Sequence, residues 1–331
     1  MLLSDLGEWE LLRRLAAFAP PGQFDDDAAL LSETSGRQLV VNTDVLVEGV
    51  HFSDATIPAR ALGWRAAAAN LSDLAAMGCT SVAGITVALV APGHTPWAWV
   101  EGVYQGLQEA LQQYGGVLLG GDCSSGSERL LSITALGHVG PGGGAIRRSD
   151  GRRGDWLVST GPHGLSRLGL ALLLEELEPN ETSQLSSTLQ KRAIAAHQRP
   201  QPRLDAVAAL TRSQPSGHPW RIGGTDSSDG LAAAVAAIGV ASGCGAVLQR
   251  SALPVDPELA QLEQGEHWCL SGGEDFELIL ALEPAWAEAL LQALPGSSRI
   301  GTLVEADPGA LRWQENNQPL PTGSAGFCHF H

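Results

Sequence analysis

Short apolar runs alternate along this chain with longer stretches of helical periodicity, and this alternation constrains the fold more than any other feature. Seven runs have the length and apolar content typical of strands, at residues 37–47, 81–90, 116–121, 130–139, 155–160, 245–250 and 276–282. Helical patterns lie between many of them, at 61–78, 96–115, 164–177, 204–212 and 228–243. The alternation predicts a mixed α/β protein.

The length of the chain and one glycine-rich segment predict two domains. With 331 residues, the chain is long enough for two domains that each bury a core of their own. The best boundary is the segment GHVGPGGGAIRRSDGRRGD at 137–155. We therefore expect an N-terminal domain over residues 1–143 and a C-terminal domain over residues 144–331.

The charge of the chain limits its ligands. Acidic residues outnumber basic ones 36 to 20, which gives a formal net charge of −16. This charge repels a phosphate backbone, so we expect no nucleic-acid partner, and any phosphate ligand must arrive with cations. The only lysine, Lys191, is not part of a G-x-x-x-x-G-K-[ST] sequence, which excludes a P-loop nucleotide site.

The cysteines and the N-terminal residues bear on the compartment. The five cysteines are scattered without a C-x-x-C pair, which argues against a zinc cluster or a disulfide framework and predicts a reducing cytoplasm. Residues 4–18 carry charges inside their apolar pattern, so we expect an amphipathic helix there and not a signal peptide. No stretch approaches the ~18 uninterrupted apolar residues of a membrane span, so no membrane partner is expected.

Acidic residues lie on both sides of a predicted strand and inside a predicted helix. Residues 25–27 are three aspartates ahead of the run at 37–47, and Asp44 lies where that strand is expected to end. In the helix at 61–78, Asn70 and Asp73 are three residues apart and share a face. Solvated side chains are the ordinary explanation, but a polar pair inside so apolar a helix weighs against it.

Two glycine-flanked segments carry further acids. Asp122 follows two glycines at the expected carboxyl end of a strand, where ligands of open α/β sheets bind, although a simple turn explains it equally well. Asp226, Ser228 and Asp229 lie at the start of the helix at 228–243. An N-cap is the commoner role for such residues, but capping needs only one of the three. The surplus oxygens, beside free helix N–H groups, suit a metal-bound phosphate.

Glu274 and Asp275 follow two more glycines, and Arg147 and Arg148 lie in the glycine-rich boundary segment. A turn and a solvated loop are the simpler explanations for these four. The acids nevertheless repeat one arrangement, at strand ends or helix starts beside glycines, from residue 25 to residue 275. Carboxylates that converge from distant segments suit Mg²⁺ ions, which retain waters and bridge to substrate phosphates. An EF-hand would concentrate its ligands in one short loop.

The motifs DDAALL, NTDVLVEGVHF, NLSDLAAMG, GGD, DSSDGL, GGEDFEL and GFCHF span most of the chain. In this combination the chain resembles the thiamine-monophosphate kinases, of the superfamily that also holds aminoimidazole ribonucleotide synthetase and selenophosphate synthetase. The resemblance implies ATP-dependent phosphorylation of thiamine monophosphate to thiamine diphosphate, the last step of thiamine diphosphate biosynthesis, by direct in-line transfer without a covalent intermediate. It also implies a homodimer with an α/β N-terminal domain and an α+β C-terminal domain.

The resemblance assigns roles by motif. It implies several Mg²⁺ ions, ATP as co-substrate, and a site in the cleft between the two domains. The implied metal ligands are Asp27, Thr43, Asp44, Asp73, Asp122, Asp226 and Asp229. The implied ATP contacts are Tyr104, Gly121, Asp122, Arg148 and Ser228, and the implied acceptor contacts are His51, Glu274 and Phe327.

The chain departs from the family pattern at Asp25, where the family usually has glycine, at Cys123, where it has threonine, and at Phe327, where it has Tyr or Trp. Two alternatives stay open. The first alternative is another enzyme of the superfamily, although the reactive N-terminal cysteine of selenophosphate synthetases has no counterpart before Cys79. The second is a nucleotide-binding protein without turnover, although retention of every acidic position weighs against this.

Overall fold

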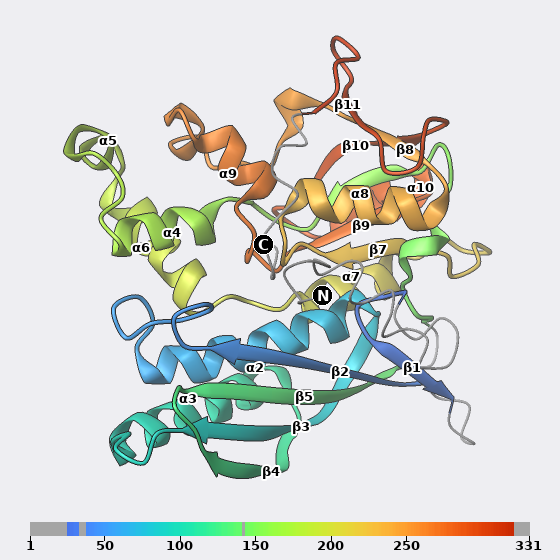
Figure 1. Ribbon diagram of the computed structural model, residues 1–331. Coiled ribbons are helices and arrows are strands. Elements are labelled where there is room, and N and C mark those ends of the chain that lie inside the picture. Colours follow the sequence, from blue (N-terminus) through green and yellow to red (C-terminus); the bar gives the residue numbers. More distant parts are fainter. Residues whose placement is uncertain (1–24, 33–37, 141–142, 321–331) are drawn as a thin grey trace, which may run out of the picture.

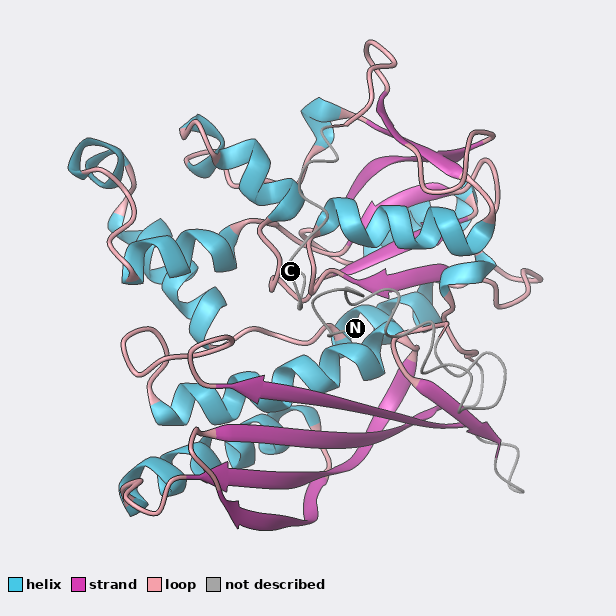
Figure 2. Ribbon diagram, in the orientation of Figure 1, coloured by secondary structure: helices cyan, strands magenta, loops and turns pink. Residues whose placement is uncertain are grey.

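The computed structural model describes residues 25–32, 38–140 and 143–320 of the chain. The helix expected at 4–18 and the predicted acceptor contact Phe327 lie outside these residues. Two sheets with their helices lie one above the other in the view of Figure 2. No helix in the described part of the chain is both long and apolar enough to cross a membrane.

The first sheet has five strands in the order β1-β2-β5-β3-β4 (Figure 1). They are β1 (Ala29–Ser32), β2 (Gln38–Val47), β3 (Cys79–Ala91), β4 (Val117–Ser125) and β5 (Leu130–Val139). All neighbours are antiparallel except β3 and β4, which are parallel and joined by the crossover helix α3 (Trp97–Tyr114). The helices α2 (Ala59–Ala76) and α3 pack on one face of this sheet and bury its first core.

Helix α2 is buried on nearly every side, because it packs against the first sheet and also reaches the second. Its alanines leave room for both neighbours, and Ala75 and Ala76 belong to a core of the second sheet. Helix α3 crosses it at Gly63, where an added Cβ would lie 1.8 Å from the carbonyl oxygen of Val103. Helix α2 ends at Ala76 with Met77 as its C-cap, and Gly78 follows in the C′ position with φ +80°, as the sequence predicts.

The second sheet has six strands in the order β11-β8-β10-β6-β9-β7. They are β6 (Trp156–Ser159), β7 (Gly223–Asp226), β8 (Gly245–Leu248), β9 (Leu278–Leu282), β10 (Ser298–Val304) and β11 (Leu311–Trp313). Helices α7 (Leu204–Ser213) and α10 (Pro284–Ala293) cover one face, and α8 (Leu231–Ser242) covers the other. Helices α4 (Leu165–Leu173), α6 (Ser187–Gln198) and α9 (Gly265–Ser271) pack together in a smaller core.

The remaining short elements are α5 (Pro179–Gln184) and the 3-10 turns η2 (Arg148–Asp150), η3 (Arg250–Ala252) and η4 (Leu259–Gln261). The architecture confirms the predicted α/β half followed by an α+β half. Two expectations about strand ends are wrong. β2 continues past Asp44 to Val47, and β4 continues past Asp122 because it pairs with β3 as far as Ser125. Both aspartates therefore lie inside strands and not after them.

Candidate active site

Three carboxylates from distant segments meet between the two sheets. Asp27 precedes β1, Asp73 lies in the last turns of α2, and Asp226 ends β7; one oxygen from each lies within 4.8 Å of the others. The Asp27 side chain is 5% exposed, and its Oδ2 atom is buried without a hydrogen-bond partner among the described residues. A buried carboxylate oxygen without a donor is a ready ligand for a cation.

Strand β2 joins this triad through its side chains on the face toward α2. Asn42 donates through Nδ2 to Asp73 Oδ2 at 2.7 Å and to Asn70 Oδ1 at 3.2 Å. The backbone N–H of Asp44 also donates to Asn70 Oδ1, at 3.2 Å. Asn42 was not singled out from the sequence, although its place two residues before Asp44 puts both side chains on one face of the strand. Its Oδ1 atom is buried and has no partner in the described structure.

Neutral and cationic donors surround the other two members. Ser72 on α2 donates to Asp226 Oδ2 at 2.6 Å, and Ser228 donates to Asp226 Oδ1 at 3.0 Å. Arg148 forms an ion pair with Asp27, and Thr225 donates to the same Asp27 oxygen at 2.8 Å. The serine-to-carboxylate bond from α2 to β7 ties the N-terminal half to the C-terminal half at the cluster.

Burial makes the ionised carboxylates costly. It raises the pKa of Asp44 to about 6, with help from the charges of Asp229 and Asp27, and that of Asp226 to about 7, with help from Asp27. Burial and the neighbouring carboxylates raise the pKa of Asp73 well above its ordinary value. Like charges brought together out of water call for a cation, so the donor set fits a divalent metal such as Mg²⁺.

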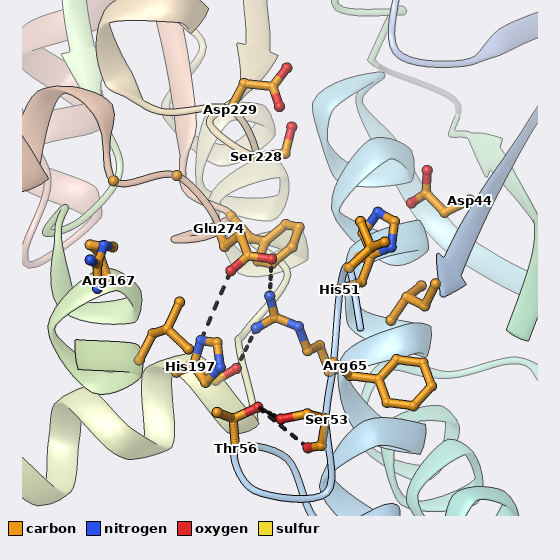
Figure 3. Close-up of a pocket in the computed structure, with 18 of the residues that line it drawn as sticks. Asp44, His51, Ser53, Thr56, Arg65, Arg167, His197, Ser228, Asp229 and Glu274 are labelled. Atoms are coloured by element: carbon orange, nitrogen blue, oxygen red, sulfur yellow. Dashed lines mark hydrogen bonds and ion pairs between the residues drawn. The ribbon is translucent and has the colours of Figure 1, made fainter. Parts of the chain in front are cut away.

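A pocket of about 960 Å³ opens beside the cluster, between the N-terminal half and helices α4, α6 and α9. Asp44, Ser228 and Asp229 line one part of it, and His51 and Glu274 lie farther along (Figure 3). The backbone N–H of Val47 donates to His51 Nδ1 at 3.0 Å, so this nitrogen carries no proton and the opposite one, Nε2, does. His51 is thereby prepared to donate a hydrogen bond.

The start of α8 does not use its polar residues as caps. The helix begins at Leu231 after Gly230, and within the described structure no side chain caps it. Ser228 bonds Asp226 instead, and Asp229 is exposed at the pocket. The N-cap explanation for Ser228 and Asp229 is therefore wrong, because the N-cap residue is Gly230, and both side chains lie at the pocket beside the helix N-terminus.

Two of the implied metal ligands point elsewhere in the isolated chain. The hydroxyl of Thr43 lies 2.7 Å from that of Thr134, on the sheet face opposite to Asn42 and Asp44, so only its backbone can serve the cluster. Asp122 is exposed on the edge strand β4. Across the sheet, Asp44 on β2 is in register with Ile133 on β5, Val87 on β3 and Gly121 on β4. At about 4.8 Å per strand, β4 therefore lies roughly 14 Å from Asp44.

Tyr104 and Cys123 line a second pocket of about 760 Å³ between α3 and β4, and Gly121 and Asp122 lie beside it in the strand. The structure thus divides the implied ATP contacts into two groups: Arg148 and Ser228 at the carboxylate cluster, and Tyr104, Gly121 and Asp122 at the far edge of the sheet. Gly121 also has a packing role, because an added Cβ would lie 1.9 Å from the carbonyl oxygen of Val87.

Comparisons with known proteins identify relatives of the chain in sequence and in structure. Family models for the N-terminal and C-terminal domains of AIR synthase related proteins match residues 25–139 and 152–314. Thiamine-monophosphate kinase from Synechococcus elongatus is 50% identical over 329 residues, which cover 99% of this chain and 98% of that protein. The enzyme of the same name from Prochlorococcus marinus is 46% identical, over 99% of this chain and 97% of that protein. The solved structure of AaThiL complexed with AMPPCP and TMP superposes with a TM-score of 0.84 at 27% identity, covering all of this chain and 99% of that one.

Proposed function

The chain belongs to the thiamine-monophosphate kinases, a family of AIR synthase related proteins, and from this premise we propose that it phosphorylates thiamine monophosphate with ATP. An oxygen of the acceptor phosphate forms a bond to the γ-phosphorus of ATP while the bond from that phosphorus to the β,γ-bridging oxygen breaks. The products are thiamine diphosphate and ADP. The observation that carries the proposal is the carboxylate cluster at one end of the pocket of about 960 Å³.

The reaction asks little covalent work of the protein. The acceptor phosphate is already ionised near neutral pH, so the chain needs no strong general base and no nucleophile of its own. Positioning of the two phosphates and stabilisation of the charge on the transferred group supply most of the acceleration. Arg148 is suited to the nucleotide phosphates, because its guanidinium lies at the carboxylate cluster, in an ion pair with Asp27.

We propose that Asp27, Asp44, Asp73 and Asp226 hold several Mg²⁺ ions. The unpartnered Asp27 oxygen and the raised pKa values of the other three support this assignment. Bound magnesium supplies the positive charge that a chain with one lysine lacks. Asp229, which lines the pocket, would be a further ligand for such a metal.

In our proposal the phosphate of the acceptor points toward Asp44 and Ser228 and its rings toward Glu274 and His51, all four of which line the pocket (Figure 3). His51 offers the Nε2 proton, and Glu274 offers a carboxylate to the cationic ring system. Phe327 remains a proposed contact from outside the described residues.

We further propose a homodimer in which β4 of one subunit completes the site of the other. Val117, Leu118 and Leu119 on β4 are 58%, 47% and 52% exposed, which is unusual for an unpaired edge strand. β1 pairs only with residues 38–41 of β2, so the outer edge at 42–47 has no strand partner in the described structure. A second copy that docks β4 along this edge would carry its Tyr104 pocket and Asp122 toward the cluster of the first.

The domain boundary near residue 143 and the cytoplasmic location also remain proposals. Strand β5 ends at Val139 and β6 begins at Trp156, which supports a boundary between them. The described cysteines, at positions 79, 123, 244 and 269, are free thiols, as is usual for a reducing compartment.

The direct test is to incubate the purified protein with ATP, Mg²⁺ and thiamine monophosphate and to separate the products by chromatography. We expect thiamine diphosphate and ADP in equal amounts, and none after chelation of magnesium. Thiamine offered in place of its monophosphate provides the control, since it presents an alcohol and not an ionised phosphate. Absence of thiamine diphosphate from the complete mixture, or equal turnover of thiamine, contradicts the proposal.

A further inference from the structure

The inner wall of the acceptor pocket is polar, and the resemblance assigns a role to only one of its residues. Arg65, Arg167, His197 and Glu274 line it (Figure 3). Arg65 is 2% exposed; it forms an ion pair with Glu274 and donates to the backbone carbonyl of His197. One guanidinium on α2 of the N-terminal half therefore holds two separate segments of the C-terminal half.

The loop that carries Glu274 has an unusual backbone. Glu274 and Phe276 have φ values of +58° and +52°, which non-glycine residues adopt at a cost and keep only when the surroundings enforce it. The Glu274 N–H donates to the carbonyl of Ser228 at 2.6 Å, and the Asp275 carboxylate accepts the N–H of Gly164 at 2.7 Å. The backbone is thus fixed on both sides of Glu274, and the ion pair with Arg65 fixes the side chain.

The charge of Glu274 depends on the same arginine. Burial alone would raise the pKa of Glu274, but the guanidinium of Arg65 outweighs it and lowers this pKa. His197 adds little positive charge, because burial and Arg65 lower its pKa to about 4 and leave the ring neutral. One carboxylate oxygen is taken by Arg65; the other lies 3.9 Å from His197 Nδ1, and the side chain is 38% exposed to the pocket.

We propose that Arg65 is a positioning residue for the acceptor: it fixes the Glu274 carboxylate so that the oxygen not paired with Arg65 meets the cationic heteroaromatic part of the acceptor. This inference rests on the proposed function. Its geometry separates recognition of the acceptor rings from the phosphate chemistry at the carboxylate cluster. Loss of Arg65 should therefore weaken acceptor binding and leave ATP binding intact.

The test is steady-state kinetics of Arg65→Gln and Arg65→Lys with each substrate varied in turn. We expect Arg65→Gln to raise the KM for thiamine monophosphate about tenfold or more and to change the KM for ATP by less than about twofold, since only one partner of a buried charge pair is removed. Arg65→Lys keeps the charge but not the two-pronged geometry, so it should recover part of the loss. It also covers the case in which Arg65→Gln fails to fold.

A matched control is Arg199→Gln. Arg199 also links the end of α6 to the N-terminal half, through Glu109 at 2.8 Å, without contacting Glu274. It should leave both KM values near those of the wild type. Equal effects of Arg65→Gln on both substrates, or the same acceptor defect in Arg199→Gln, would show that Arg65 only clamps the halves together. If the wild type is active and both Arg65 variants keep its KM for the acceptor, this inference alone is overturned. If the wild type makes no thiamine diphosphate, the proposed function is overturned and the inference with it.

Discussion

The ionised form of Asp73 is one of the main sources of electrostatic destabilisation at the site. Its carboxylate lies among those of Asp27, Asp44 and Asp226, and the neutral amide of Asn42 is the only side-chain donor that lowers its pKa in the described structure. Such a group gains stability when a cation binds, because repulsion among the carboxylates is then compensated. The donor that bonds Asp73 in the described structure is neutral and leaves its charge uncompensated, which supports the proposed metal site.

Replacing Asp73 with asparagine should lower turnover by at least ~10²-fold, the scale for removing one preorganised charge-stabilising group. It should also reduce the rise in melting temperature on adding Mg²⁺ and ATP. Asp307→Asn, at an exposed aspartate distant in sequence from every cluster residue, is the control and should match the wild type. Wild-type turnover in Asp73→Asn would show that this carboxylate is not needed for the reaction.

His163 gives the chain a defined response to acid. The side chain is fully buried, with Nε2 3.0 Å from the Ser227 hydroxyl, and burial lowers its pKa from about 6.5 to about 4. Between these pH values the unfolded chain binds a proton at this site and the folded chain does not. This histidine therefore costs the fold stability as the pH falls through that window, up to about 3 kcal/mol.

The variant His163→Gln should flatten this part of the stability profile, whatever its stability at neutral pH. Urea unfolding at pH 6.5 and pH 4.5 measures the difference in the free energy of unfolding for each protein. The buried acids oppose the trend, but they are present in both proteins and cancel in the comparison. Parallel profiles for the wild type and the variant would mean that His163 titrates normally.

At the residue scale, the sequence predicted the acidic residues of the cluster better than the residues that bond to them. Asp27, Asp73 and Asp226 were identifiable because each sits in a short polar motif beside glycines or alanines. Ser72 and Arg65 were not, because their roles depend on groups that are distant in the chain: Ser72 bonds Asp226, 154 residues away. The local sequence pattern around Ser72 does not indicate such a contact.

At the level of elements, the crossing of α2 and α3 sets the position of the polar face of α2. Two glycines allow it: an added Cβ at Gly63 would lie 1.8 Å from the carbonyl oxygen of Val103, and one at Gly106 would lie 1.9 Å from that of Arg60. The backbones therefore approach as closely as glycine permits. Any separation of the helices would shift Asn70 and Asp73 relative to β2.

We expect Gly63→Ala to lower the free energy of unfolding by about 1–3 kcal/mol through overpacking, even though alanine alone would favour the helix by about 1 kcal/mol. Urea unfolding measures it. Gly93→Ala is the matched control, since no atom lies within 4 Å of its added Cβ and its φ is not positive. A Gly63→Ala protein as stable as the control would refute the close crossing.

The long elements and some of the short strands were predictable. The strands β6, β8 and β9 lie within the predicted runs 155–160, 245–250 and 276–282, whereas β7, β10 and β11 were not predicted. Strand β5 has the predicted bounds 130–139, and α2 and α3 begin and end within two residues of the predicted bounds. Their periodicity is local and extends over ten residues or more. The strands β7, β10 and β11 have four, seven and three residues and lack a distinctive pattern, so tertiary pairing alone defines them.

At the scale of the whole molecule, one chain does not bring all the implied ligands together. Asp44 and Asp122 lie on β2 and β4, with β5 and β3 between them. The sequence motifs did not indicate this separation, because the type of a residue does not show which subunit contributes it to a site. The edge of β2 at 42–47, which has no strand partner among the described residues, and the exposed apolar edge β4 together favour the proposed site shared between two copies.

Mixed dimers test this central claim most directly. Chains carrying Asp44→Asn and Asp122→Asn are coexpressed with different tags, and the dimer that holds one of each is purified by both tags. Each variant alone should form an inactive homodimer. In a shared site the mixed dimer has one site with both substitutions and one with neither, so it should show about half the wild-type turnover per dimer. A mixed dimer as inactive as the two homodimers would place Asp44 and Asp122 in the same chain's site and contradict the account.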